Sequence, residues 1–265
     1  MARPVITLTT DFGQADGYVG TMKGVILGIC PEATLVDIAH DLCPQAVRQA
    51  AYVLHTAAPY FPPGTVHLVV VDPGVGSRRR PIVVQTARAL YVAPDNGVLS
   101  LALAHDPPHL AIHLTETAQA SATFHGRDIF APAAAHLACG VDPRDLGEPL
   151  PVSELITLPG LYPEPQPDGS WRGTILHVDR FGNLITNIQY PMTNIQYPMT
   201  NDQISVLAGG ERIVGLKRTF SDVAVGELVA YVGSSGYLEI AVREGSAAAR
   251  LGMAVGDPVC VEGLP

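Results

Sequence analysis

Side chains capable of acid–base chemistry follow apolar runs at several points in this chain. In VVVDPGVGSRRRP, residues 69–81, Asp72 ends an apolar run and a glycine-rich turn separates it from Arg79. A histidine, His125, lies in the short segment FHGRD. A carboxylate and an imidazole can accept or relay a proton, whereas a guanidinium stays charged and favours the anionic form of a neighbour. Together these three residue types are suited to acting on a polar ligand.

Further polar residues stand where strands or turns are expected to end. They are Asp11 in TTDFG, Asp95 and Asn96 in PDNG, and Asp179 with Asn183 in DRFGN. Taken singly, each fits an ordinary turn, because Asp and Asn before glycine are common turn formers. Open α/β sheets, however, gather the residues at the carboxyl ends of their strands into one crevice. The set as a whole therefore indicates a binding site.

The local sequence argues against two phosphate-binding signatures and a metal site. DPGVGSRRR lacks the Gly-Lys-Ser/Thr of a P-loop, and its glycines are not followed by the third glycine of a dinucleotide fingerprint. His105, His109 and His113 have the spacing of ligands on one helix face, but Pro107 and Pro108 break a helix there. We expect no metal site.

The segments that must position these residues alternate between strand and helix periodicity. Strand-like runs cover residues 4–12, 33–42 and 64–72, and helix-like runs cover 17–29 and 46–61. Beyond them lie a hairpin-like run at 81–93, a short helix at 96–105, a strand at 109–116 and a helix at 128–140. This order predicts a layered α/β domain with a mostly parallel sheet.

The pattern changes near residue 145. Six prolines lie between Asp145 and Ser170 in a segment with little periodicity, which predicts a linker. Short apolar runs separated by glycine turns follow, which predicts an all-β, barrel-like domain. We therefore expect an N-terminal α/β domain at 1–145, a Pro-rich linker at 146–170 and a C-terminal β-barrel domain at 171–265.

One heptapeptide, TNIQYPM, occurs at 186–192 and again, unchanged, at 193–199. Its period is too short for a repeat architecture, whose units need about 20 residues or more. We interpret it as a local duplication in which the first copy continues a strand. Pro191 and Pro198 are expected to direct the remainder to an edge or a loop.

Composition restricts the partners of this 265-residue chain. Its formal net charge of −9 argues against nucleic acid, because phosphate binding depends on basic residues. No apolar run reaches the roughly 20 residues of a membrane helix, and no signal-peptide core is present at the N-terminus, so we expect a cytoplasmic protein without a membrane partner. The spacing of the four cysteines suits buried thiols better than a disulfide scaffold.

A series of segments, in order along nearly the whole chain, resembles the S-adenosyl-L-methionine (SAM) hydroxide adenosyltransferase family, the adenosine-forming SAM hydrolases related to fluorinases and chlorinases. The segments are TLTTDFG, GYVGTMKGVI, VVDPGVGS with the following arginines, APDNGVLS, TFHGRDIFAPAAAHLA, VDRFGNLITNI and SSGYLEIAV. The resemblance implies an N-terminal α/β domain and a C-terminal β-barrel. It also implies a homotrimer that binds SAM, the substrate, between the N-domain of one subunit and the C-domain of its neighbour, without a cofactor.

The resemblance further assigns roles to individual residues. Catalysis would fall to Asp72, Arg79 and His125, acting on a water that attacks C5′ of the SAM ribose, expels methionine and leaves adenosine. The substrate contacts would come from the ribose-binding Asp11 and from Asn96, Asp179, Phe181, Asn183, Ser234 and Glu239.

Two other functions remain open from the residues. A SAM- or adenosine-binding protein without turnover would share most of them, and a SAM-dependent halogenase would present a hydroxyl-lined halide pocket instead of the Asp/Arg pair. The presence of the pair favours hydrolysis. Arg78 and Arg80 are expected to face solvent or a subunit contact, because neighbouring side chains point in different directions.

Overall fold

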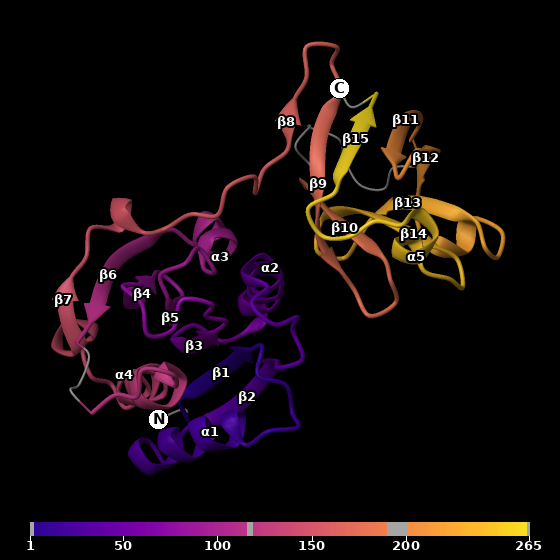
Figure 1. Ribbon diagram of the computed structural model, residues 1–265. Coiled ribbons are helices and arrows are strands. Elements are labelled where there is room, and N and C mark those ends of the chain that lie inside the picture. The colour runs from indigo at the N-terminus through magenta and orange to yellow at the C-terminus, as the bar shows by residue number, and fades with distance from the viewer. Residues whose placement is uncertain (1–2, 116–118, 190–200, 264–265) are drawn as a thin grey trace. The chain divides into compact units, whose positions relative to one another are not determined.

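The structure, a computed structural model, describes residues 3–115, 119–189 and 201–263. The chain divides into two compact units, Met1–Leu158 and Pro159–Pro265, which we call the N-terminal unit and the C-terminal unit (Figure 1). The division lies within the segment predicted as a linker, and residues 146–158 belong to the N-terminal unit.

The N-terminal unit is a layered α/β structure, which confirms the predicted fold class for this part. Its strands are β1 (Val5–Thr10), β2 (Thr34–Ala39), β3 (Thr65–Val70), β4 (Pro81–Thr86), β5 (Ala89–Pro94), β6 (Pro108–Leu114) and β7 (Gly147–Pro149). Its helices are α1 (Tyr18–Ile29), α2 (Val47–Ala57), α3 (Ser100–His105) and α4 (Ala131–Ala138). Short helical turns are η1 (Ala58–Tyr60), η2 (Gly126–Phe130), η3 (Pro143–Leu146) and η4 (Val152–Glu154).

The sheet of this unit is mixed, so the prediction of a mostly parallel sheet is wrong. Its strand order is β2-β1-β3-β5-β4-β6-β7. β1 is parallel to β2 and β3, and β3 is parallel to β5. β4 is antiparallel to β5 and β6, and β6 is antiparallel to β7. The direction changes at β4 because a two-residue turn joins it to β5, and so short a connection permits only antiparallel pairing.

Helices cover both faces of this sheet. On β3, Val66 and Leu68 belong to the hydrophobic core that α1 and α4 cover, whereas Val69 belongs to the core that α2 and α3 cover (Figure 1). This alternation is the period-two pattern of a strand buried on both faces. Because both faces are occupied, the ends of the strands are where a ligand has access.

The C-terminal unit is an all-β barrel, as predicted. Its strands are β8 (Glu164–Pro165), β9 (Trp171–Val178), β10 (Leu184–Gln189), β11 (Asn201–Ala208), β12 (Glu211–Lys217), β13 (Leu228–Val232), β14 (Tyr237–Val242) and β15 (Pro258–Glu262). It also contains the short turn η5 (Phe220–Asp222) and helix α5 (Ala247–Leu251).

The strand order closes this barrel on itself. The order is β10-β14-β13-β12-β11-β15-β9, and β9 also pairs with β10, so seven strands form a ring and β8 extends the edge of β9. The neighbours are antiparallel except β12 and β13, which are parallel. Closure leaves few free strand edges, and apolar side chains from around the ring fill the interior.

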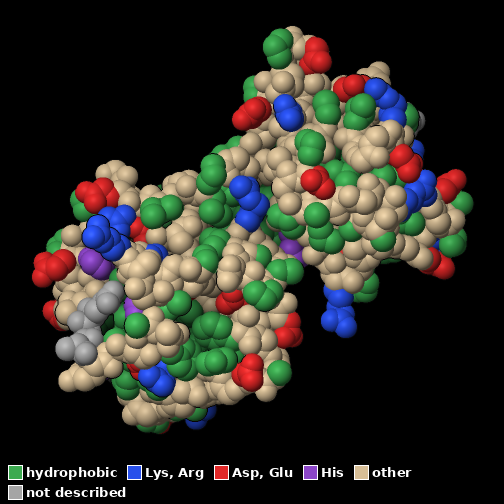
Figure 2. Space-filling view, viewed as in Figure 1, with side chains coloured by type: hydrophobic (Ala, Val, Ile, Leu, Met, Phe, Trp, Pro, Cys, Tyr) green, Lys and Arg blue, Asp and Glu red, His purple; other side chains and the backbone are tan. Residues whose placement is uncertain are grey.

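The first four residues of the duplicated heptapeptide lie in β10, and the whole second copy lies outside the described residues. Within the described ranges, every helix is too short or too polar to cross a membrane. Acidic and basic side chains are interspersed over the face shown in Figure 2.

Two histidines of the N-terminal unit are buried. His67 lies near the start of β3, and His55 lies near the end of α2. Burial lowers the pKa of His55 and of His67 to about 4. His67 is 1% exposed, its Nδ1 lies 2.7 Å from the hydroxyl of Thr7, and its ring stacks on Tyr91 with 5.2 Å between centroids. Both imidazoles are therefore uncharged at neutral pH.

We predict that the free energy of unfolding falls as the pH is lowered from 6.5 toward 4, and that His67→Gln removes part of this fall. The unfolded chain binds a proton at this imidazole below about 6.5, whereas the folded protein does so only near 4, so acid favours unfolding. A shift of this size corresponds to roughly 3 kcal/mol for one group. Urea titrations at both ends of the range measure the effect, and an equal fall in both proteins would contradict the assignment to His67.

Candidate active site

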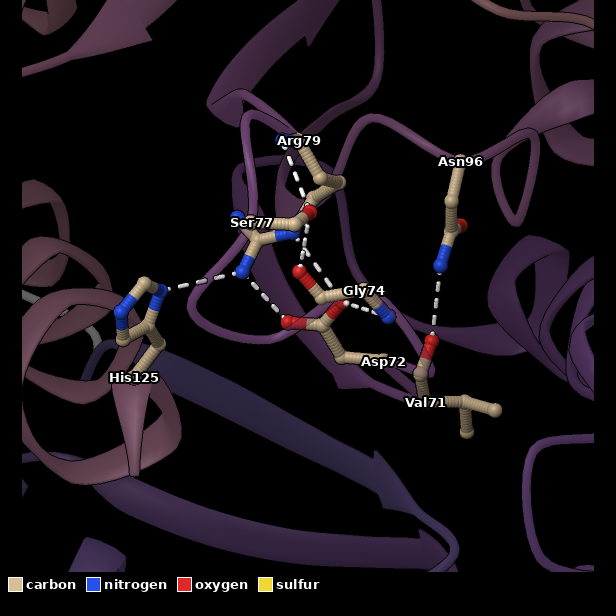
Figure 3. Close-up of polar contacts among 7 residues, drawn as sticks. All are labelled: Val71, Asp72, Gly74, Ser77, Arg79, Asn96 and His125. Carbon is tan, nitrogen blue, oxygen red and sulfur yellow. Dashed lines mark hydrogen bonds and ion pairs between the residues drawn. The ribbon is translucent and has the colours of Figure 1, made fainter. Parts of the chain in front are cut away.

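The loop between β3 and β4 folds back on itself and returns the chain to Asp72. The Oδ1 atom of Asp72 accepts a hydrogen bond from the backbone N–H of Gly74 at 3.2 Å. Ser77 donates from its backbone N–H and its hydroxyl to the carbonyl of Gly74, at 3.1 and 2.6 Å. These contacts hold a compact loop whose end, Arg79, lies against its beginning (Figure 3).

Asp72, Arg79 and His125 form one buried polar cluster. Nε and Nη2 of Arg79 donate to the two carboxylate oxygens of Asp72 at 3.0 and 2.5 Å, a bidentate ion pair (Figure 3). Nη2 also lies 3.0 Å from Nδ1 of His125, at the start of η2. A guanidinium can only donate, so Nδ1 accepts and the ring proton of a neutral His125 is on Nε2. The structure thus brings together the three residues predicted as catalytic.

One hydrogen-bond donor of this cluster lacks an acceptor among the described residues. Nη1 of Arg79 is buried and has no hydrogen-bond partner among the described residues. The guanidinium carbon lies 5.2 Å from the centre of the Phe130 ring, which offers no carbonyl or carboxylate. A buried donor without an acceptor is unfavourable by about 1–3 kcal/mol, so this atom marks a place for a water or a polar ligand atom.

An aromatic cavity of about 150 Å³ adjoins the cluster. Asp72 and His125 line it together with Phe12, Tyr18 and Phe124. The ring of Tyr18 lies 5.7 Å from that of Phe12 and 5.1 Å from that of Phe124, between centroids. A space with apolar walls and charged groups at one side can hold a small polar molecule away from bulk water.

Two other predicted residues of this unit lie at the same edge of the sheet. Asp11 follows β1, which is parallel to β3, and its Oδ2 accepts from the backbone N–H of Gln45 at 2.7 Å. Asn96 donates from Nδ2 to the carbonyl of Val71 at 2.9 Å, and its Oδ1 accepts from the backbone N–H of Val98. Asn96 thereby holds the residue that precedes Asp72 (Figure 3).

Arg80 is a positioning residue that the sequence analysis missed. It was expected to face solvent or another subunit, but Nε and Nη2 donate to Oδ2 of Asp95 at 2.9 and 2.5 Å, and Nη2 also donates to the carbonyl of Glu154. Asp95 is 2% exposed, and its other oxygen accepts from the backbone N–H of Ile156. The β4–β5 hairpin could have indicated this contact. Pro81 of β4 pairs with Pro94 of β5, so the adjacent residues 80 and 95 lie opposite each other.

In the C-terminal unit, Asp179 organises the turn between β9 and β10. Its Oδ1 accepts from the backbone N–H groups of Phe181 and Asn183 at 2.9 and 2.8 Å, and its Oδ2 accepts from Nδ2 of Asn183 at 2.8 Å. The ring of Phe181 is 76% exposed. The turn therefore presents a carboxylate, an amide and an aromatic ring at one place.

Glu239 and Ser234 lie on neighbouring segments of the same unit. Burial raises the pKa of Glu239, and the negative charge of Asp179 adds to this, whereas a hydrogen bond from Tyr231 opposes it. The carboxyl group of Glu239 packs against Gly233, and the next residue, Ser234, is exposed. Within the described ranges of both units, no cluster of three or more His, Cys, Asp or Glu side chains is arranged to hold a metal ion.

These features define a two-unit protein in which a buried carboxylate–guanidinium–imidazole cluster lies at the carboxyl end of parallel strands, the usual place for an active site in an α/β sheet. The chain belongs to the SAM hydroxide adenosyltransferase family: the N-terminal domain of that family matches residues 6–147 and its C-terminal domain matches residues 173–260.

Individual relatives agree with this placement. The chain is 45% identical to an (R)-S-adenosyl-L-methionine hydrolase of Thermus thermophilus, over 97% of this chain and 98% of the relative. It is 28% identical to a fluorinase of an Actinoplanes species, over 90% of each chain. A crystal structure of an uncharacterized conserved protein from Thermotoga maritima superposes with a TM-score of 0.88 at 37% identity, covering 97% of this chain and 99% of the other.

We predict that Gly76→Ala destabilises the β3–β4 loop. Gly76 has φ of +74°, and a Cβ there would lie 2.4 Å from the carbonyl oxygen of Ala122. We expect a loss of roughly 1–3 kcal/mol, because both the backbone conformation and the contact are unfavourable. Gly24→Ala, on α1 with open space around it, is the matched control and should be neutral or stabilising by about 0.5–1 kcal/mol. Thermal denaturation compares the two, and equal stability would contradict the prediction.

Proposed function

We propose that this protein hydrolyses SAM to adenosine and L-methionine, with water as the nucleophile at C5′ of the ribose. The observation that carries the proposal is the buried Asp72–Arg79 pair with His125 beside it and one free guanidinium donor. Membership of the family and the 45% identity to a relative named as a SAM hydrolase support the same reaction. The fluorinase relative is more distant, at 28% identity, so halogenation is the weaker candidate.

The reaction needs a nucleophile more than it needs an acid. The sulfonium of SAM leaves as a neutral thioether, so the C5′–S bond breaks without protonation of the leaving group. Water, with a pKa of about 15.7, is a poor nucleophile, and a nearby guanidinium favours its hydroxide form. Nη1 of Arg79 would donate to the water oxygen and so stabilise the negative charge that develops on it.

Asp72 is the better candidate for accepting the proton. The lone pair of Nδ1 of His125 is already used by Arg79. The carboxylate of Asp72 offers about four acceptor positions and receives three donors from Arg79 and Gly74, so one position is left for the water. In this proposal His125 orients Arg79, the water oxygen bonds to C5′, and its proton passes to Asp72 and then to solvent.

The remaining predicted residues would bind the substrate. Asp11 is suited to the ribose hydroxyls because an ionised carboxylate accepts two hydrogen bonds. Asp179 would attract the ammonium group of the methionine moiety, and the exposed ring of Phe181 would stack on the adenine. Asn183, Ser234 and Glu239 would complete that part of the site. Asn96 would act indirectly, through the backbone beside Asp72.

We further propose that the protein is a cytoplasmic homotrimer that requires no cofactor, with each active site shared between the N-terminal unit of one subunit and the C-terminal unit of the next. SAM would be its partner, and neither nucleic acid nor a membrane would be. All four cysteines are free thiols, in keeping with a reducing compartment. A ring whose subunits each contribute a different surface to every interface is a closed, heterologous assembly.

We predict that Arg79→Lys lowers kcat for adenosine formation at least about a hundredfold, since removal of one charge-stabilising donor from an active site typically costs 10²–10³ in kcat. A lysine retains the charge but not the bidentate fork. Arg78→Lys is the matched control: Arg78 is exposed on the adjacent position, and the variant should keep parental activity. Chromatography of adenosine and methionine after incubation with SAM measures both. Equal activity of the two variants would refute the role of Arg79.

We predict that two inactive variants complement each other. Asp72→Asn disables the N-terminal half of a shared site, and Asp179→Asn disables the C-terminal half. Random mixing within a cyclic trimer gives about one quarter of the sites with both halves intact, so co-expressed variants should recover about that fraction of parental activity. Light scattering checks the trimer. A mixed trimer with no recovered activity would show that each site lies within one subunit.

A further inference from the structure

The N-terminal unit contains a second cavity, which we call the amino-end cavity, of about 280 Å³. It lies between the ends of α2 and α3 on one side and the first residues of β3 and β5 on the other, as its lining residues His55, His105, His67 and Tyr91 indicate. His67 and Asp72 are five residues apart along β3 and its extension, so the cavity is roughly 17 Å from the catalytic cluster, at the opposite end of the strand.

The walls of the amino-end cavity are aromatic. His67 stacks on Tyr91, and Phe61 lies edge-on to His67 with 5.7 Å between centroids. His55 and His105 form a second pair of rings, with centroids 4.3 Å apart. A volume just under about 300 Å³, the lower end for ligand pockets, suits one flat bicyclic molecule.

Two polar side chains of this wall, those of His67 and Tyr91, can form a hydrogen bond with a molecule in the cavity. Nδ1 of His67 lies 2.7 Å from the hydroxyl of Thr7, which leaves Nε2 of the ring for a ligand, and Tyr91 offers its hydroxyl. The two residues are only 1% and 3% exposed. The cavity is the space from which these two atoms can be reached.

The charges around the amino-end cavity favour a ligand that donates hydrogen bonds. Asp106 contributes a carboxylate, and α2, which is eleven residues long, ends here with its carbonyls, the negative end of its dipole. The histidines His55 and His67 are uncharged. The one guanidinium in the lining, Arg88, is directed to the carbonyl of Pro59, 3.4 Å away. An anionic ligand would find little here to balance its charge.

We propose that the amino-end cavity is a second small-molecule site, which binds a neutral bicyclic heteroaromatic compound with N–H donors, of the size of a nucleobase. The ring would lie between the two aromatic pairs, with its N–H groups toward Asp106 and its ring nitrogens toward the hydroxyl of Tyr91. Nothing in this site depends on the SAM reaction, and the two can fail independently.

Calorimetry with adenine, benzimidazole and 2-naphthoate tests this proposal on the full-length protein. We expect saturable binding of adenine or benzimidazole and none of 2-naphthoate, which has the size but also an unbalanced charge. Phe181→Ala, which removes the ring proposed to stack on the adenine of SAM, should bind the heterocycle as the parent does, which separates this site from the active site. If neither heterocycle binds, or if 2-naphthoate binds equally well, the proposal is wrong.

A pair of variants on α3 locates the binding. Ala102 lines the cavity and is 5% exposed, whereas Ala104, two residues on, faces solvent. Ala102→Leu should fill the cavity and weaken binding by more than about tenfold, which corresponds to 1.4 kcal/mol. Ala104→Leu should leave it unchanged. Equal binding by both variants would overturn the assignment.

Histidine NMR keeps the test decisive if Ala102→Leu does not fold. In the parental protein, the imidazole signals of His67 and His55 should shift on titration with the heterocycle while those of His125 stay in place. His67→Phe identifies the signals of His67. Shifts confined to His125 would place the ligand at the catalytic cluster and refute the second site.

Discussion

The polar cluster and the loop between β3 and β4 depend on the ion pair between Asp72 and Arg79. Its two side chains are only 5% and 7% exposed, and removing two charges from water is unfavourable unless their geometry is good and their other donors and acceptors are satisfied. The bidentate contact, the Gly74 amide and the His125 ring meet most of that requirement. Two further contacts hold the backbone of the loop in place. Asn96 binds the carbonyl of Val71, before Asp72, and Arg80 binds the buried Asp95 at the other end of the loop. Nη1 of Arg79 has no acceptor among the residues that the structure describes, and substrate chemistry would enter at this atom.

The antiparallel direction of β4 is what makes this ion pair possible. Asp72 follows β3 at the carboxyl edge of the sheet, and β4 begins at Pro81, only nine residues later, at the same edge. In an all-parallel sheet β4 would begin at the opposite edge, and a crossover of a dozen or more residues would separate it from β3. The short hairpin makes β4 antiparallel to β5. Arg79 and Arg80, which precede β4, therefore lie at the edge of the sheet where β3 and β5 end. The departure from a purely parallel sheet is therefore part of the site.

The sequence allowed the residues of the site to be predicted better than the direction of the strands. Asp72, Arg79 and His125 could be singled out because their side chains are suited to acid–base chemistry, and a family resemblance connected them. The hairpin at 81–93 was visible, but its effect on the whole sheet was not, because strand direction depends on pairing between distant segments. Arg80 was misjudged for a similar reason: alternation along a strand separates it from Arg79, but only the register of β4 on β5 reveals that Asp95 is its partner. The roles of Asp179 and Glu239 rest on a fold in which β9, β10 and β14 meet, which local patterns do not specify.

In the barrel of the C-terminal unit, the number of strands restricts their directions. Strands around a closed ring can alternate up and down throughout only if their number is even. This ring has seven, so at least one pair of neighbours must run the same way, and that pair is β12 and β13. Two parallel neighbours cannot be joined by a tight turn, so the chain from residue 218 to residue 227 has to travel back along the wall before β13 can start. Val223 in this return path packs on Val229, Tyr231 and Ala241, a small apolar cluster separate from the core inside the ring. The odd number of strands thus requires a return segment on the outside of the barrel, and here that segment covers a small hydrophobic patch on the outer face of β13 and β14.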